Sequence, residues 1–310
     1  MRILYMGTPD FAIPTLDELM HRGHEIVGVV TQPDKPQGRH MTLTPPPVKK
    51  RALEAGLKVF QPETLKNEAF KRELEELSPE LIVVVAYGKI LPEYILCFPR
   101  FGCINLHGSI LPKYRGAAPM QRAVMEGERE IGATVMYMEK GLDTGDMLSV
   151  MKFELLDDMD FEYVHDRLST EGARLLADTV ENMTEGQKGI PQDDALSTYA
   201  AKIEKADLVL SFDISARELH NRVRGLSPVP LTFATLNGKK IKFKKTVIAQ
   251  ESGDNSDKIG TVAEISSKGI KILCREGAVY LTELVPEGKK PMSAAAFVNG
   301  RGGAVGDKFE

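Results

Sequence analysis

Apolar segments of strand length alternate with amphipathic segments of helical length through the first half of the chain. The apolar runs predict strands at residues 2–6, 25–31, 81–86, 103–107, 133–138 and 147–153. The amphipathic segments predict helices at residues 11–22, 48–55, 68–77 and 161–185, with a proline-rich loop at 32–47. Strands that alternate with helices are typical of a doubly wound α/β domain built on a parallel sheet.

The pattern changes after residue 186. Residues 187–201 are polar with scattered Gly and Pro, as is typical of a linker. A short helix at 215–223 is followed by short predicted strands at 231–236, 240–247, 260–266, 269–273 and 278–284. The Asn237-Gly238 pair between two of them is a strong hairpin signal. We therefore expect a parallel-sheet domain over 1–187, a linker over 188–206 and a small OB-like barrel over 207–310.

The composition is that of an ordinary globular protein. The 310 residues are 42% hydrophobic and 27% charged, a length at which two domains are more usual than one. No apolar stretch approaches the roughly 20 residues that span a bilayer, and the first residues form a strand-like run rather than a signal peptide. The three cysteines have no metal-ligand spacing. We expect a cytoplasmic protein with reduced thiols, no metal and no membrane partner.

Charge is divided unevenly along the chain. Residues 201–310 carry 18 lysines and arginines against 13 acidic residues, whereas residues 1–200 carry 22 against 31. Eight basic residues and a single acid, Glu218, fall within residues 217–245. The basic residues are Arg217, Arg222, Arg224, Lys239, Lys240, Lys242, Lys244 and Lys245. A basic second domain indicates either a polyanionic partner or a solvated charged face, and charge alone leaves both open.

The most informative residues lie at and after the predicted strand 103–107. Asn105 and His107 are two apart, so both side chains share one face of that strand. An amide donor and an imidazole at a strand end suit acyl transfer, because one can stabilise an oxyanion while the other carries a proton. Asp143, in the loop Gly141-Leu142-Asp143-Thr144-Gly145, could support His107 electrostatically. Equally, His107 could be a core histidine and Asp143 a turn-capping residue.

The first strand-to-helix turn argues against a dinucleotide cofactor. It reads Gly7-Thr8-Pro9-Asp10, with one glycine where a dinucleotide fingerprint has three. The side chains of Pro9 and Asp10 would obstruct the close approach of a pyrophosphate.

Several motifs together resemble the formyltetrahydrofolate-dependent formyltransferases. The string Asn105-Leu106-His107-Gly108-Ser109-Ile110-Leu111-Pro112, followed by Arg115-Gly116 and by Asp143 in Gly-x-Asp-Thr-Gly, carries the resemblance. The segments Gly-Thr-Pro-Asp-Phe at 7–11, Val85-Ala86-Tyr87-Gly88 and Gly-Lys-Lys-Pro-Met-Ser-Ala at 288–294 extend it along essentially the whole chain. These additional segments restrict the resemblance to the formyltransferases that act on methionyl-tRNA.

The resemblance implies a Rossmann-like catalytic domain, an OB-like domain that binds tRNA, and a formyl transfer from 10-formyltetrahydrofolate to the α-amine of methionyl initiator tRNA. It assigns catalysis to Asn105, His107 and Asp143. It assigns folate binding to Ser109, Ile110, Leu111, Pro112, Val85, Ala86, Tyr87 and Gly88. It requires no metal.

The same resemblance points to the tRNA-binding residues. The loop after the second strand, 32–49, would reach the acceptor end through Lys35 and Arg39, although His40-Met41-Thr42 replaces a more basic sequence. The tRNA backbone would occupy the basic segment, through Arg217, Arg222, Arg224, Lys240, Lys242, Lys244 and Lys245. The rival functions are a formyltransferase for an amino sugar nucleotide, a formyltetrahydrofolate hydrolase and an inert RNA-binding protein. We expect a monomer.

Overall fold

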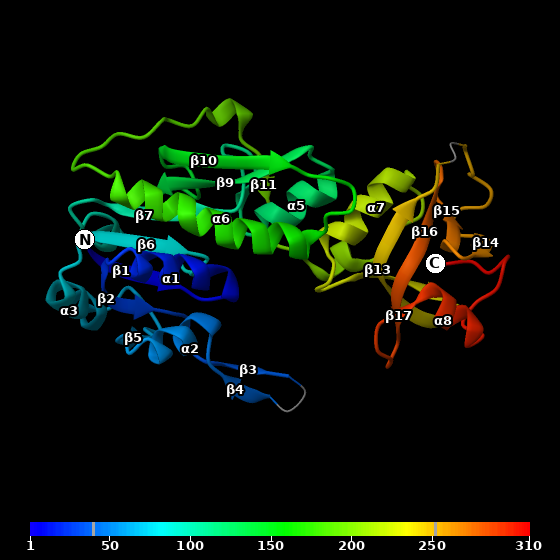
Figure 1. Cartoon of the computed structure of the whole chain (residues 1–310), viewed down its shortest axis with the longest axis horizontal. Coiled ribbons are helices and arrows are strands. Elements are labelled where there is room, and N and C mark those ends of the chain that lie inside the picture. Colours follow the sequence, from blue (N-terminus) through cyan, green and yellow to red (C-terminus); the bar gives the residue numbers. More distant parts are fainter. Residues whose placement is uncertain (39–40, 251–252) are drawn as a thin grey trace. The chain divides into compact units, whose positions relative to one another are not determined.

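The chain folds into two units, each assembled from more than one segment. The computed structural model describes residues 1–38, 41–250 and 253–310 (Figure 1). Met1–Pro119, Ile131–Phe153 and His165–Ala200 form the first unit. Met120–Glu130, Glu154–Val164 and Ala201–Glu310 form the second.

A seven-stranded sheet is the centre of the first unit, in the order β10-β9-β7-β6-β1-β2-β5. The bounds are β1 Arg2–Gly7, β2 Glu25–Val30, β5 Val59–Phe60, β6 Leu81–Val85, β7 Cys103–His107, β9 Glu130–Tyr137 and β10 Met147–Glu154. The five neighbouring strands β7, β6, β1, β2 and β5 pair in parallel. All five residues of β6 and all five of β7 are buried. β9 pairs antiparallel with β7. The predicted α/β class is therefore confirmed, with a mixed rather than wholly parallel sheet.

Helices lie between the parallel strands along the chain: α1 Ile13–His21, α2 Pro47–Glu54, α3 Glu68–Leu77 and α4 Glu93–Leu96. Two more helices, α5 Pro119–Glu126 and α6 Phe161–Glu181, precede β9 and follow β10. A 3₁₀ turn at Asp10–Ala12 precedes α1, and α6 ends at Glu181, four residues before the predicted end. A Cβ added at Gly172 of α6 would lie 3.0 Å from the Leu106 side chain. Leu106 of β7 therefore packs tightly against α6, which directs Asn105 and His107 to the opposite face of the sheet.

The loop expected at 32–47 contains a small hairpin. β3 (Lys35–Gln37) pairs antiparallel with β4 (Thr42–Thr44), and Figure 1 shows this hairpin extending away from the sheet of the first unit. Lys49 Nζ donates to Asp34 Oδ1 at 2.8 Å and to Gln61 Oε1 at 2.6 Å, which anchors the base of the hairpin. The sequence did not predict these strands, because prolines and polar residues interrupt the alternation of apolar and polar residues that is typical of a strand.

The second unit is an antiparallel sheet with α7 (Ala216–Gly225) and α8 (Ala294–Asn299). Ser215 and Glu218 form a capping box that begins α7. The strand order is β12-β13-β16-β15-β14, and β17 pairs with β16. The bounds are β12 Thr232–Leu236, β13 Lys239–Ile248, β14 Val262–Ser266, β15 Gly269–Leu273, β16 Ala278–Pro286 and β17 Met292–Ser293.

The last residues of the chain join the two edges of this sheet. Thr235 of β12 and Glu310 exchange backbone hydrogen bonds of 2.7 and 2.9 Å, and the Val262 N–H of β14 donates to the Asp307 carbonyl at 2.8 Å. Phe309 packs into the interior with ring centroids 5.8 Å from Phe212 and 5.4 Å from Phe243. The C-terminal segment thus bridges β12 and β14 and closes the sheet into a small barrel, as the sequence predicted.

Residues of the predicted linker are folded. β11 (Tyr199–Ala200) pairs in parallel with β8 (Arg115–Gly116), and 3₁₀ turns occupy Asp194–Leu196 and Lys205–Leu208. The domain limits at 187 and 207 remain predictions, but the segment up to Ala200 belongs to the first unit.

Candidate active site

The parallel strands bring four loops to one edge of the first sheet. β1, β2, β6 and β7 all end there, which is where ligands bind in open α/β sheets. The Tyr87 carbonyl, after β6, accepts hydrogen bonds from Thr8 Oγ1 at 3.0 Å and from Gln32 Nε2 at 3.1 Å. The loops after β1, β2 and β6 are therefore tied to one another.

Asn105 and His107 lie at the end of β7 and are 9% and 5% exposed. The Nε2 atom of His107 is 2.8 Å from the Tyr114 carbonyl oxygen. Because a carbonyl only accepts, Nε2 carries the hydrogen of this bond. Nδ1 is therefore the atom that holds the lone pair when the ring is neutral and can take up a proton.

Asp143 faces that Nδ1 atom. Its Oδ2 lies 3.7 Å from His107 Nδ1, within ion-pair range but too far for a direct hydrogen bond, and accepts from the Gly116 N–H at 2.8 Å. Asp143 has a φ of +54°, a left-handed conformation that aspartate adopts more readily than most residues with a Cβ. The structure thus brings the three predicted catalytic residues to one side of β7, with the Asp143 carboxylate beside the imidazole.

The predicted folate residues fall into two loops at the same edge. After β7, Thr134 Oγ1 donates to the Ser109 carbonyl at 2.8 Å and accepts from the Leu111 N–H at 3.1 Å. Ser109 Oγ donates to the Lys113 carbonyl at 2.6 Å. Ser109 and Leu111 are buried, whereas Ile110 and Pro112 are half-buried. The buried residues Ser109 and Leu111 hydrogen-bond within the fold and fix the loop, whereas Ile110 and Pro112 have surface that a ligand can contact.

The second folate segment follows β6. Val85 and Tyr87 are buried, whereas Ala86 and Gly88 are exposed and have left-handed φ values of +48° and +84°. Burial raises the pKa of Tyr87 to about 12, and its hydroxyl has no hydrogen-bond partner among the described residues. The exposed backbone at 86 and 88 is the part of this segment that can contact a ligand.

The predicted tRNA-binding residues do not form one uniform surface. Arg224 is 6% exposed and donates to the Leu156 and Met159 carbonyls at 2.8 and 3.1 Å. Arg217 pairs with Asp157. The Arg224 guanidinium is thus hydrogen-bonded to the segment before α6, and its burial makes it unsuited to contact a phosphate.

Some lysines of β13 also make contacts within the protein, whereas others do not. Lys244 pairs with Glu283 at 2.8 Å, and Lys240 lies 3.5 Å from the centre of the Phe233 ring. Within the described residues, Lys242, Lys245 and Arg222 make no ion pair. Lys35 lies exposed on β3, and Arg39 lies outside the described residues.

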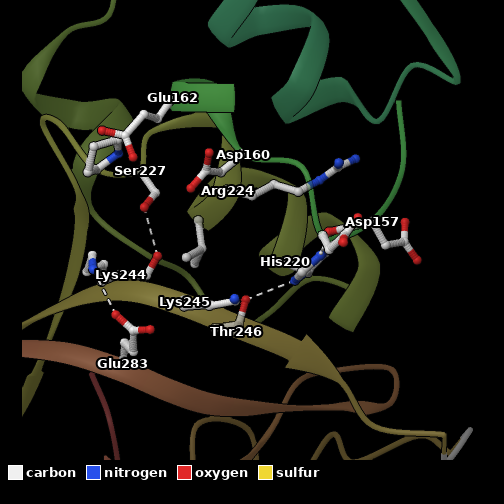
Figure 2. A pocket seen from close by; sticks show the side chains of 13 residues that line it. Asp157, Asp160, Glu162, His220, Arg224, Ser227, Lys244, Lys245, Thr246 and Glu283 are labelled. Carbon is white, nitrogen blue, oxygen red and sulfur yellow. Dashed lines mark hydrogen bonds and ion pairs between the residues drawn. The ribbon is translucent and has the colours of Figure 1, made fainter. Parts of the chain in front are cut away.

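Lys244 and Lys245 line a pocket together with several acidic residues. Figure 2 shows Asp157, Asp160 and Glu162 around it, with the Lys244–Glu283 pair on its rim. Four acidic side chains from residues 157–162 line it, so an RNA backbone is disfavoured inside the pocket and Lys245 would have to contact phosphate outside it.

Sequence reasoning missed one residue close to the catalytic set. The Gln192 side chain hydrogen-bonds both the Asp143 loop and Arg115. Arg115-Gly116 belongs to the motif noted above, but a glutamine in a polar segment carries no local signal of such a contact. Over the residues that the structure describes, no group of three His, Cys, Asp or Glu side chains is arranged to hold a metal. Nor does that part of the chain contain a helix long and apolar enough to cross a membrane.

Comparisons with known proteins agree with this geometry. Residues 1–180 match the formyl transferase family model, and residues 202–302 match the model of the formyl transferase C-terminal domain. The methionyl-tRNA formyltransferase of Macrococcus caseolyticus is 44% identical over 99% of this chain and 98% of its own length. That of Bacillus subtilis is 42% identical over 99% of this chain and 96% of its own length.

Solved structures share the fold at lower identity. The N-formyltransferase from Helicobacter canadensis, solved with folinic acid and dTDP-3-aminofucose, has a TM-score of 0.67 at 17% identity, over 92% of this chain and 98% of its own. HypX from Aquifex aeolicus, solved with tetrahydrofolic acid, has a TM-score of 0.65 at 18% identity over 96% of this chain. The match covers 47% of HypX. Two family models and full-length relatives above 40% identity show that the chain belongs to the methionyl-tRNA formyltransferase family.

Proposed function

We propose that this enzyme transfers the formyl group of 10-formyltetrahydrofolate to the α-amine of methionyl initiator tRNA, for translation initiation in the cytoplasm. The observation that carries the proposal is the buried Asn105–His107 pair with the Asp143 carboxylate 3.7 Å from His107 Nδ1. It occurs in a chain that matches methionyl-tRNA formyltransferases over their full length. The sugar-nucleotide enzyme resembles it at 17% identity, which supports a common fold and not a common substrate.

The proposed chemistry needs a proton carrier and an oxyanion donor. The amine nitrogen bonds to the formyl carbon, the bond from that carbon to folate N10 breaks, the amine loses one proton and N10 gains one. Asn105 donates its amide N–H to the oxyanion of the tetrahedral intermediate, and His107 carries the proton at Nδ1. The Asp143 carboxylate stabilises the positive charge on the ring while it holds that proton.

The two loops described above supply the folate site in this proposal. Half-buried Ile110 and Pro112 and the exposed backbone at Ala86 and Gly88 would contact the pterin and its substituents. Ser109, Leu111, Val85 and Tyr87 would shape the site from behind, since their side chains are buried. Such a mixture of apolar surface and free backbone groups is typical of small-molecule sites.

Unpaired cations of the second unit are proposed to hold the tRNA backbone. Lys242, Lys245 and Arg222 are the strongest candidates, and Lys240 is a fourth. Arg217 and Lys244 would first have to leave Asp157 and Glu283, so we assign them weaker roles and exclude Arg224. The hairpin with Lys35 and Arg39 is proposed to contact the acceptor end, and a monomer is proposed to suffice.

The decisive experiment combines the protein with 10-formyltetrahydrofolate and methionyl initiator tRNA and measures formylmethionine. We expect product with the unaltered protein and a loss of roughly 10²–10³ in kcat for His107→Ala. The exposed His21→Ala is the matched control and should leave kcat unchanged. Product formation by His107→Ala at the unaltered rate would contradict the proposed mechanism, and absence of product with the unaltered protein would contradict the function.

A further inference from the structure

The segment from Ile190 to Ala200 is not a passive connection, because Gln192 joins two loops of the candidate active site. Its Nε2 donates to the backbone carbonyls of Asp143 and Gly145, both at 2.8 Å. Its Oε1 accepts from Arg115 Nε at 3.0 Å and from Arg115 Nη2 at 2.8 Å. One side chain therefore uses both amide hydrogens and its oxygen at once, and all these residues lie in the first unit.

The Asp143 backbone needs such support. It adopts a single left-handed conformation, which aspartate tolerates when local hydrogen bonds hold the turn. Gln192 binds the carbonyl of Asp143 itself and that of Gly145 two residues later, so it holds both sides of the turn. This turn aims the carboxylate at the Gly116 N–H and at His107 Nδ1.

The same segment also supports the histidine side of the pair. The Tyr114 N–H donates to Thr198 Oγ1 and the Arg115 N–H to the Thr198 carbonyl, both at 2.9 Å. The Tyr114 carbonyl is the acceptor of the His107 Nε2 hydrogen. The loop that orients the imidazole and the loop that carries the carboxylate are thus fastened to one stretch of chain.

We propose that Gln192 is a positioning residue that sets the distance between Asp143 and His107, acting through the Asp143 and Gly145 carbonyls and through Arg115. This inference rests on the proposed function, in which Asp143 and His107 serve proton transfer. An amide is required, because only a side chain with two donors and an acceptor at one end can bind both carbonyls and the guanidinium.

Gln192→Glu tests the proposal with little change of shape. It keeps the contact with Arg115 but replaces the two donors by a carboxylate oxygen that faces two carbonyl oxygens. We expect kcat to fall on the order of 10²-fold, as a displacement of about 1 Å at a reacting group does. KM for both substrates should stay within about twofold, since the substrate contacts are untouched. Gln187→Glu is the matched control, because the Gln187 side chain bonds only Thr184 of its own turn.

A double-mutant cycle separates positioning from general stability. In an Asp143→Asn background, Gln192→Glu should lower kcat by less than about threefold, because the carboxylate that it positions is already gone. An equal loss in both backgrounds, an unaltered kcat, or a loss confined to KM would overturn the inference. If Gln192→Glu does not fold, Gln192→Met, which has a similar length and no donors, replaces it in the cycle.

The outcomes also distinguish this inference from the proposed function. If Asp143→Asn alone left kcat unaltered, the proposed function of the pair would fail. If Asp143→Asn lowered kcat and both Gln192 variants retained it, only the positioning role would fail.

Discussion

At the scale of single residues, the site separates two tasks that both concern the reacting carbonyl. His107 is fixed by a hydrogen bond from Nε2 to a carbonyl, which leaves Nδ1 for the proton and places it beside Asp143. Asn105, two residues earlier on the same face of β7, is the neutral donor for an oxyanion in the proposed mechanism. Their roles can therefore be tested with different substitutions.

Asn105→Asp discriminates the donor role from simple packing. The new side chain has nearly the same shape but, when ionised, only accepts hydrogen bonds and adds negative charge where the oxyanion forms. We expect kcat to fall by at least the roughly 10²–10³ typical of a lost oxyanion donor, and by no less than in Asn105→Ala. Initial rates with saturating substrates measure this.

The control for that experiment is Asn67→Asp. Asn67 caps α3 by accepting from the Phe70 N–H at 3.1 Å, a role that aspartate fills equally well, so activity and stability should be retained. If Asn105→Asp proved clearly more active than Asn105→Ala, the donor role would be refuted.

At the scale of elements, α7 is tied to the segment before α6 through a buried histidine. His220 Nε2 donates to the Asp157 carbonyl at 2.9 Å, and His220 Nδ1 lies 3.0 Å from Thr246 Oγ1 of β13 (Figure 2). Burial lowers the pKa of His220 below its usual 6.5, and the charges of Arg224 and Arg217 act in the same direction, opposed by the Asp157 contacts. The fold thus favours the neutral ring.

This shift predicts a pH dependence of stability. Because the folded pKa lies below the unfolded value, the unfolded chain binds more protons as the pH falls below about 6.5. The free energy of unfolding should therefore decrease from pH 7 toward pH 5, and this decrease should be smaller in His220→Gln. Urea unfolding followed across that range measures the slope, with the exposed His21→Gln as control. An identical slope in His220→Gln would show that this histidine does not contribute.

The elements show which structural features a local pattern can predict. A continuous apolar run predicted β6, which is buried on both faces. In β7, where polar and apolar residues alternate, the period of two placed Asn105 and His107 on one face. The antiparallel direction of β9 and the hairpin within 32–47 have no such local signal. Pairing direction depends on distant chain segments, and prolines interrupt the strand pattern in the hairpin.

The candidate site was predictable to a similar degree. The position of Asp143 in a loop after a strand suggested that it supports His107, but left a turn-capping role open, since 36 residues separate the two; the resemblance decided between these alternatives. Gln192 was not predicted, because its partners at Arg115, Asp143 and Gly145 meet it only in the folded chain. The burial of Arg224 likewise depends on carbonyls more than sixty residues away.

At the scale of the whole molecule, basic residues are in excess over residues 201–310 and acidic residues over residues 1–200. The basic residues differ, however, in how freely they can contact a phosphate. Of the five lysines of β13, Lys244 pairs with Glu283 and Lys240 lies over the Phe233 ring, whereas Lys239, Lys242 and Lys245 have no ion-pair partner among the described residues. Phosphate contacts dominate affinity for nucleic acids and make it depend on salt. Among the lysines of β13 without an ion pair in the described residues, we expect Lys242 and Lys245 to contribute most.

Charge reversal at both positions tests this ranking. Lys242→Glu combined with Lys245→Glu should weaken binding of methionyl initiator tRNA and reduce its salt dependence by about one unit of slope per lost phosphate contact. Binding of the folate should not change. Lys258→Glu with Lys268→Glu, an equal charge change at exposed sites of the same unit, should have a smaller effect. Equal losses in both pairs would indicate a general electrostatic field rather than contact at β13.

The hydrogen bonds of Gln192 and of Thr198 have a consequence for how the chain can be divided. A fragment that ends at residue 187 would lose the amide that holds the Asp143 turn and the strand that pairs with Arg115–Gly116, whereas a fragment that ends at Ala200 would retain both. Natural variation in the length of the connection is for the same reason expected after Ala200 and not between Ile190 and Ala200. Under the proposed positioning role of Gln192, a change in the length of those eleven residues would displace Asp143 from His107.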